Sequence, residues 1–283
     1  MKINSGIAAA LFSALFFGIS TPLAKVLVLE VPPIALAGLL YLGSGVGLLT
    51  WRWLRQRTNI TVMSREAPLV RADWGWLAGA ILAGGVIAPP LLMMGLARTP
   101  GSTAALLLNL EGVFTAILAW FIFHENVDRR IAIGFFLIAS AGVLLSWEGT
   151  PEGGLPFGVL AVRAACLGWA VDNNLTQRIS GSDPVQVAGI KGLVAGCINL
   201  ALAGFSGWDL APLPVLLAAI GVGFLGYGVS LSLFVWALRD LGTARTGAYF
   251  SVAPFFGSVM ALIIFSERPG SMFWAAAAMM MIG

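Results

Sequence analysis

Apolar stretches about as long as a membrane is thick recur along the chain, and they constrain its fold more than any other feature. A spanning helix needs roughly 20 mainly apolar residues. Ten such stretches are present, at 6–25, 33–55, 74–97, 102–123, 130–147, 156–178, 184–205, 212–238, 244–265 and 269–283. Charged residues make up only 10% of the 283 residues, too few to cover a soluble domain. The sequence therefore predicts an all-α integral membrane protein with ten transmembrane helices.

The connections between these stretches are short, and their basic residues gather on one side. With the N-terminus inside, most Lys and Arg residues fall in cytoplasmic connections, whereas Lys25, Arg98 and Arg268 fall outside. The positive-inside rule therefore predicts that both termini are cytoplasmic. The first apolar run lacks an Ala-x-Ala cleavage site and leads into a second span, which favours a transmembrane helix over a signal peptide. Compact loops favour a bacterial inner (plasma) membrane.

The second half of the chain repeats the first. The stretch from Gly95 to Glu125 aligns with the stretch from Trp236 to Glu267 at an offset of 141–142 residues. Five spans per repeat is an odd number, so the two halves must enter the membrane in opposite senses. We expect a first repeat at 1–147, an external linker at 148–155 and a second repeat at 156–283. The last helix lacks the counterpart of 143–147, so either the sequence given stops inside that helix or the helix is short.

Two corresponding motifs point to a known family. Leu110-Glu111-Gly112-Val113-Phe114 running to His124-Glu125, and Ala253-Pro254-Phe255-Phe256 running to Ser266-Glu267, resemble the EamA repeat of the drug/metabolite transporter superfamily. The resemblance covers nearly the whole chain. It implies two inverted five-helix halves around a central cavity, and export or exchange of small metabolites, often amino acids. Where the family commonly has Leu-Glu-Pro, this chain has Leu-Glu-Gly, which predicts a softer kink in the first half.

Polar and ionisable side chains at membrane depth are candidates for substrate binding, because each central charge costs about 2.5–3.5 kcal/mol. Glu111 lies closest to the midplane, where it would bind a substrate amine or couple a proton, or else form a structural hydrogen bond as a neutral acid. Lys191 would meet a substrate carboxylate or phosphate, or extend to the interface along its aliphatic stem. Asn109 and Ser251 hold matching positions in the two repeats. The expected substrate-binding set is Glu111, Asn109, Trp169, Lys191, Tyr249, Ser251 and Tyr227.

A further set of residues is expected to act as gates or hinges. A proline within a membrane helix frees a backbone carbonyl and can kink the helix. Asp172 and Asn173 belong to the most polar stretch of any span, near its expected cytoplasmic end. The expected gate or hinge residues are Pro22, Pro89, Pro90, Asp172, Asn173 and Pro254.

Other chemistries find little support in the sequence. The stretch from Gly221 to Gly226 fits the G-x-G-x-x-G dinucleotide pattern, but it lies in an apolar span with no preceding strand, so it predicts close helix packing instead. The single histidine, His124, has no second His or Cys nearby, so no metal site is expected. We find no nucleophile, base and acid set and no basic-aromatic patch for nucleic acid. No enzyme activity and no cofactor are expected; the predicted partners are a small-molecule substrate and the lipid bilayer.

These observations favour a secondary transporter that works by alternating access. Its substrate would be a small polar metabolite, and the family resemblance implies efflux of amino acids or related compounds. Without a nucleotide-binding motif, the energy must come from the substrate gradient, a counter-substrate or an ion, with Glu111 as the coupling acid if protons drive transport. An exchanger of phosphorylated or nucleotide-linked sugars is an alternative, although only Lys191 and Arg163 offer cations in mid-span. A non-transporting membrane scaffold or a lipid-modifying membrane enzyme is the alternative from other classes.

Overall fold

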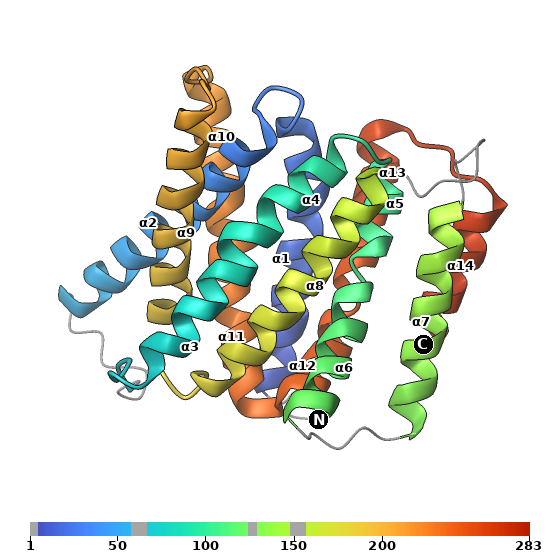
Figure 1. The fold of residues 1–283 in the computed structure, drawn as a ribbon, viewed down its shortest axis with the longest axis horizontal. Helices are drawn as coiled ribbons and strands as arrows, with labels where there is room; N and C mark the ends of the chain where they lie inside the picture. The colour runs from blue at the N-terminus through green and yellow to red at the C-terminus, as the bar shows by residue number, and fades with distance from the viewer. Residues whose placement is uncertain (1–4, 58–66, 124–128, 148–156) are drawn as a thin grey trace.

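The computed structural model describes residues 5–57, 67–123, 129–147 and 157–283, which form a bundle of helices (Figure 1). His124, Glu125 and the expected linker at 148–155 lie outside the described residues. In chain order the helices are α1 Ser5–Leu27, α2 Pro33–Arg57, α3 Asp73–Ala80, η1 Ile81–Ile87, α4 Ala88–Leu96, α5 Gly101–Leu107, α6 Leu110–Phe123, α7 Arg129–Trp147, α8 Phe157–Arg178, α9 Pro184–Phe205, α10 Leu213–Val222, η2 Gly223–Val229, α11 Ser230–Leu241, α12 Thr243–Phe250, α13 Ala253–Phe265 and α14 Ser271–Ile282.

All ten expected segments are helical where they are described, and seven of the helical stretches are long and apolar enough to cross a membrane. Two further apolar helical stretches, Ile133–Leu145 of α7 and Ser271–Ile282 of α14, are shorter. Helix α8 is long enough, with 22 residues, but it carries Arg163, Asp172 and Arg178. It lies in the middle of the bundle, packed on α4, α6 and η1, whereas α7 and α14 pair at one edge (Figure 1). The number of crossings and the opposite senses of the halves remain predictions.

The two halves of the chain share an order of elements. Each half has two long helices, then a helix interrupted by a π-helical turn, then a helix broken in its middle, then a single helix. The π-helical turn η2 begins 142 residues after η1, and α12 begins 142 residues after α5. The second half has Pro254 as the second residue of α13, and the matching position in the first half is Gly112. The break after α5 is nevertheless present. A proline is therefore not required for this break.

The π-helical turn η1 precedes the proline pair at which a kink was expected. Pro89 and Pro90 stand at the start of α4 and have no amide hydrogen. In this turn Ala88 N donates to Ala83 O, five residues earlier. In the same register Pro89 and Pro90 would be the donors to Gly84 O and Gly85 O, so these two carbonyl oxygens lack a backbone donor. In an apolar environment such a carbonyl must find another donor.

Side chains from three other helices donate to these carbonyl oxygens. Gly84 O accepts hydrogen bonds from Tyr41 Oη of α2 at 2.7 Å and from Trp169 Nε1 of α8 at 2.9 Å. Gly85 O accepts from Asn199 Nδ2 of α9 at 2.9 Å. The irregular turn thus fastens η1 to α2, α8 and α9.

Glycines bring several helices into backbone contact, as the small-residue patterns predict. A Cβ on Gly192 of α9 would lie 2.6 Å from the backbone nitrogen of Gly45 on α2, and a Cβ on Gly45 would collide with the backbone of Leu193. In the dinucleotide-like stretch, a Cβ on Gly223 would collide with the backbone of Leu40. The expectation of close helix packing at this stretch is confirmed. Such contacts let helices associate without a hydrophobic driving force between them.

We expect Gly45→Val to destabilise the protein by about 1–3 kcal/mol, because the added side chain must push α9 away from α2. The midpoint of thermal unfolding of the purified protein in detergent measures the effect. The matched control is Gly221→Val in α10, where an added Cβ has no atom within 4 Å and should leave the midpoint unchanged. Equal midpoints for both variants would contradict the close packing of α2 and α9.

Candidate substrate-binding cavity

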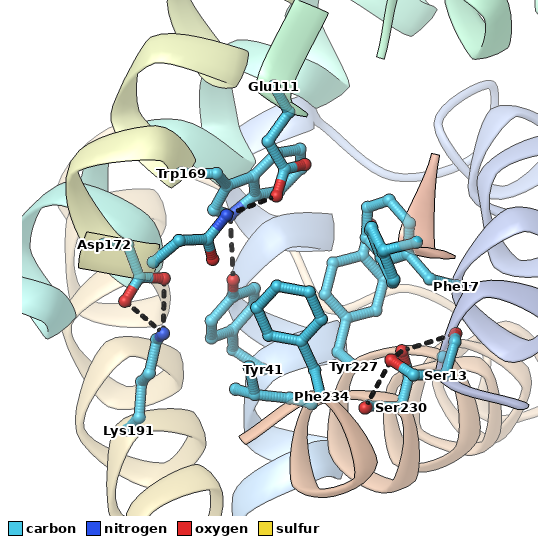
Figure 2. Close-up of a pocket in the computed structure, with 14 residues that line it drawn as sticks. Ser13, Phe17, Tyr41, Glu111, Trp169, Asp172, Lys191, Tyr227, Ser230 and Phe234 are labelled. Atoms are coloured by element: carbon cyan, nitrogen blue, oxygen red, sulfur yellow. Dashed lines mark hydrogen bonds and ion pairs between the residues drawn. The ribbon is translucent and has the colours of Figure 1, made fainter. Parts of the chain in front are cut away.

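A cavity lies among the central helices (Figure 2). Six aromatic side chains and three ionisable side chains line it, together with two serines. They are Phe17, Tyr41, Trp169, Tyr227, Phe234 and Phe250, then Glu111, Asp172 and Lys191, then Ser13 and Ser230. Asn173 and Gly226 also contribute to the lining. Both halves of the chain therefore build one site.

Phe17 of α1 is the centre of the aromatic wall. Its ring centroid lies 5.6 Å from that of Trp169, 5.8 Å from that of Tyr227 and 5.4 Å from that of Phe250. The contacts with Trp169 and Tyr227 are edge-on, a favourable geometry for aromatic pairs. Trp169 is further held by its hydrogen bond to Gly84 O. The wall is thus fixed to the irregular turn η1.

Glu111 lies in the first turn of α6, directly after the break that separates α6 from α5. Its side chain is 8% exposed, and Asn173 Nδ2 donates to Glu111 Oε1 at 2.8 Å. Within the part of the chain that the structure describes, no donor is found for the other carboxylate oxygen. The partial positive charge at a helix start favours a carboxylate there. The break therefore places an accessible acidic oxygen at the cavity.

Lys191 of α9 pairs with Asp172 of α8 (Figure 2), and its ammonium contacts both carboxylate oxygens. Lys191 is 1% exposed and Asp172 3%. Thr176 Oγ1 donates to Asp172 Oδ1 at 2.9 Å, and a Cβ on Gly84 would collide with the Asp172 carboxylate. Lys191 is therefore neither unpaired, as direct binding of a substrate anion would require, nor extended along its stem to the bundle surface.

A second, smaller cavity adjoins the first, between α6 and α12. Asn109, Ser251 and Pro254 line it, with Gly112, Thr115 and Gly247. The matching positions of Asn109 and Ser251 in the two repeats thus do bring both side chains to one space. Asn109 Nδ2 donates to Met280 Sδ at 3.4 Å.

Four expected residues lie elsewhere. Tyr249 packs beside Ala9, Ala10 and Ala237 and lines neither cavity. Pro22 is buried within α1 outside both linings, and Pro89 and Pro90 shape the cavity only through η1. The roles assigned to all these residues from the sequence stay predictions.

Several cavity residues were not singled out from the sequence. Ser13 Oγ donates to Ser230 O at 2.7 Å and Ser230 Oγ donates to Ser13 O at 2.9 Å, which ties α1 to α11. Serines within apolar helices give little signal in a sequence. Phe17 does give a signal in the sequence. It begins a stretch, 17–20, that is weakly similar to the stretch 169–172, which begins at Trp169 in the second half. The structure brings these two side chains into contact.

Polar contacts close the bundle at the end where α1 finishes. Lys25 Nζ donates to Leu96 O at 2.8 Å and to Thr99 O at 2.7 Å. The Glu267 carboxylate accepts from the backbone nitrogens of Gly101 at 2.6 Å and Ser102 at 2.9 Å, at the start of α5. These contacts join α1, α4, α5 and the segment after α13, so elements of both halves meet here.

The fold and the cavity define a class: a helical membrane protein with a buried, polar and aromatic central site built by two halves, as in transporters. The chain belongs to the EamA-like transporter family, which it matches twice, over residues 4–147 and 156–283. It is therefore an integral membrane protein and a transporter. Among the described residues, no group of three or more His, Cys, Asp or Glu could hold a metal ion.

Relatives that align with most of this chain carry transporter names. An "Uncharacterized transporter" of Methanothermobacter thermautotrophicus is 30% identical over 273 residues, covering 93% of this chain and 80% of that one. The "Uncharacterized inner membrane transporter YedA" of Escherichia coli K12 is 23% identical over 248 residues, covering 87% and 78%. One solved crystal structure aligns with a TM-score of 0.69 over 97% of this chain and 93% of its own, at 19% identity. That likeness concerns the fold alone.

We expect removal of one partner of the Lys191–Asp172 pair to destabilise the protein by about 3–5 kcal/mol, since it leaves a buried charge unpaired. Lys191→Met and Asp172→Leu should each lower the unfolding midpoint in detergent. The double variant should recover most of the loss, because two apolar side chains of similar size replace the pair. A double variant that is as unstable as the sum of the single ones would contradict the pairing.

Proposed function

We propose that the protein is a secondary carrier that moves small polar metabolites bearing a basic nitrogen, with amino acids or closely related compounds as the substrates. In this proposal ten spans form two inverted halves that alternate access to the central cavity, both termini are cytoplasmic, and transport is efflux across a bacterial inner membrane. The family and the central cavity support a carrier. The observation that carries the substrate class is the uncompensated charge of Glu111.

The charges that line the main cavity sum to a negative site. Lys191 and Asp172 neutralise each other, which leaves the Glu111 carboxylate. One oxygen of Glu111 accepts from Asn173, and the other has no donor among the described residues. A substrate ammonium group would supply that donor, and a charge-assisted hydrogen bond of this kind is among the strong ones. The surrounding aromatic rings also attract a cation.

The same charges argue against phosphorylated or nucleotide-linked sugars. A phosphate group needs converging cationic donors. Lys191 is held by Asp172, and Arg163 Nη2 donates to Gly142 O at 2.9 Å. Neither cation is set up for an anionic substrate. A scaffold without transport would have no use for a buried cavity with an accessible carboxylate, and burying such a group is costly.

Glu111 is also the group through which protons would be coupled. A carboxylate cannot hold a proton and a substrate ammonium at the same time, so the two would compete for one site. Because binding of one excludes the other, Glu111 alone is sufficient for the exchange of a proton for a substrate, and no second acidic residue is needed. A counter-substrate with a basic nitrogen would use Glu111 in the same way.

The test is uptake of a panel of radiolabelled amino acids into proteoliposomes that contain the wild type or Glu111→Gln. We expect saturable uptake by the wild type and a loss of about tenfold or more in the variant, since a charge-assisted bond is removed. The matched control is Glu30→Gln, an exposed glutamate outside both cavities, which should transport like the wild type.

Three results would count against the proposal. Uptake that is equal in the wild type and Glu111→Gln would remove Glu111 from substrate binding while keeping the carrier. A transport rate that is independent of pH in both proteins would exclude proton coupling through Glu111. No uptake of any amino acid by folded wild-type protein would overturn amino acids as the substrates.

A further inference from the structure

We propose that the smaller cavity is a second subsite of the same binding site, and that it takes a substrate side chain that ends in a hydrogen-bond donor such as a hydroxyl or an amide. This inference rests on the proposed function, because it assigns orientation and side-chain preference to a substrate whose ammonium lies at Glu111. It is carried by three observations: the residues that both cavities share, the polar atoms in the smaller cavity, and the two glycines in its wall.

The two cavities meet at one wall. Five residues line both of them: Phe17, Glu111, Asn173, Phe234 and Phe250. Glu111 therefore borders both spaces, and an ammonium group bound to its carboxylate can carry substituents into each. The rings of Phe17 and Phe250, with centroids 5.4 Å apart, stand at the shared wall. A substrate with two substituents on the carbon next to its ammonium fits this arrangement.

Two polar side chains of the smaller cavity, Asn109 and Ser251, offer acceptors. Asn109 is 3% exposed, its Nδ2 is used by Met280, and its Oδ1 has no partner among the described residues. Ser251 Oγ donates its hydrogen to Ala248 O at 2.7 Å, so its lone pairs are available to accept a hydrogen bond. A buried acceptor without a partner is costly. A ligand donor in this space would therefore complete the hydrogen bonding of Asn109.

The main cavity offers a hydrogen-bond donor. Tyr227 Oη is buried and has no partner within the described residues, so its hydrogen is available for an acceptor on the substrate. An α-amino acid presents an acceptor, an ammonium group and a side chain on one carbon. Its carboxylate would face Tyr227, its ammonium Glu111, and its side chain the smaller cavity.

Two glycines keep the smaller cavity open. Gly112 of α6 and Gly247 of α12 both line it, and a Cβ on either would have no atom within 4 Å. A larger side chain at these positions would therefore occupy the space without forcing the backbone to move.

The experiment uses proteoliposomes and three radiolabelled probes: glycine, glutamine and methionine. Glycine has no side chain, and glutamine and methionine have side chains of similar size of which only that of glutamine ends in a donor. We expect the wild type to prefer glutamine over methionine, and Asn109→Leu to bring that ratio close to one. A site built to bond a polar group discriminates strongly against an analogue without it, here by about tenfold. Asn109→Leu should unfold no more easily than the wild type, since it removes an unpaired buried oxygen.

The glycine variants test the space itself. Gly112→Val and Gly247→Val should each lower uptake of glutamine and methionine about tenfold relative to uptake of glycine, because only the longer side chains need the filled volume. Gly221→Val, whose added side chain also has open space but lies outside both cavities, is the matched control and should leave these ratios unchanged.

The outcomes separate the two proposals. Uptake of all three probes that falls equally in Gly112→Val and Gly247→Val, or an unchanged glutamine to methionine ratio in Asn109→Leu, overturns the second subsite and leaves the carrier standing. No uptake of any probe by the folded wild type overturns amino acids as substrates and this subsite with them. Ratios that change in the expected sense support both.

Discussion

The structure depends on a backbone constraint: carbonyl oxygens deep in an apolar bundle must find hydrogen-bond donors. Pro89 and Pro90 deny donors to Gly84 and Gly85, and Tyr41, Trp169 and Asn199 supply them instead. One donor comes from the first half of the chain and two come from the second. Since Tyr41 and Trp169 are also cavity walls, the site takes its shape from an irregular turn that does not itself contact the substrate space.

The buried charges follow a second rule: an ionised side chain in the membrane interior is paired with an opposite charge unless it serves a function such as binding a substrate. Helix α8 supplies Asp172 to Lys191 and Asn173 to Glu111 from neighbouring positions. Asp172, Asn173 and Asn174 are buried inside the bundle, so α8 can lie at its centre although it is not among the helices that are apolar enough for a simple span. A helix can be central because it is polar, provided that its neighbours satisfy it.

Much of this could be predicted from sequence, because the cost of polar groups in a membrane is large and local. The helical segments follow from that cost, and so does the choice of Glu111 as a cavity residue. Pairing could not be predicted, since apolar periodicity does not say which helices meet: Lys191 and Asp172 lie on different helices, 19 positions apart. Tyr249 illustrates a further limit. It lies two residues from Ser251, and side chains two apart on a helix face away from each other, so it packs on the α1–α11 side instead.

The carboxylate of Glu267 has a consequence for biosynthesis. It is translated 165 residues after Ser102, yet it binds the backbone nitrogens of Ser102 and Gly101. Helix α7 likewise has its main neighbour in α14, and α1 packs against α11 and α13. The first half therefore leaves the ribosome with exposed amides and uncovered helix faces, and it must persist in that state until the second half arrives. The packing of the first half is therefore completed only after these later segments have been translated.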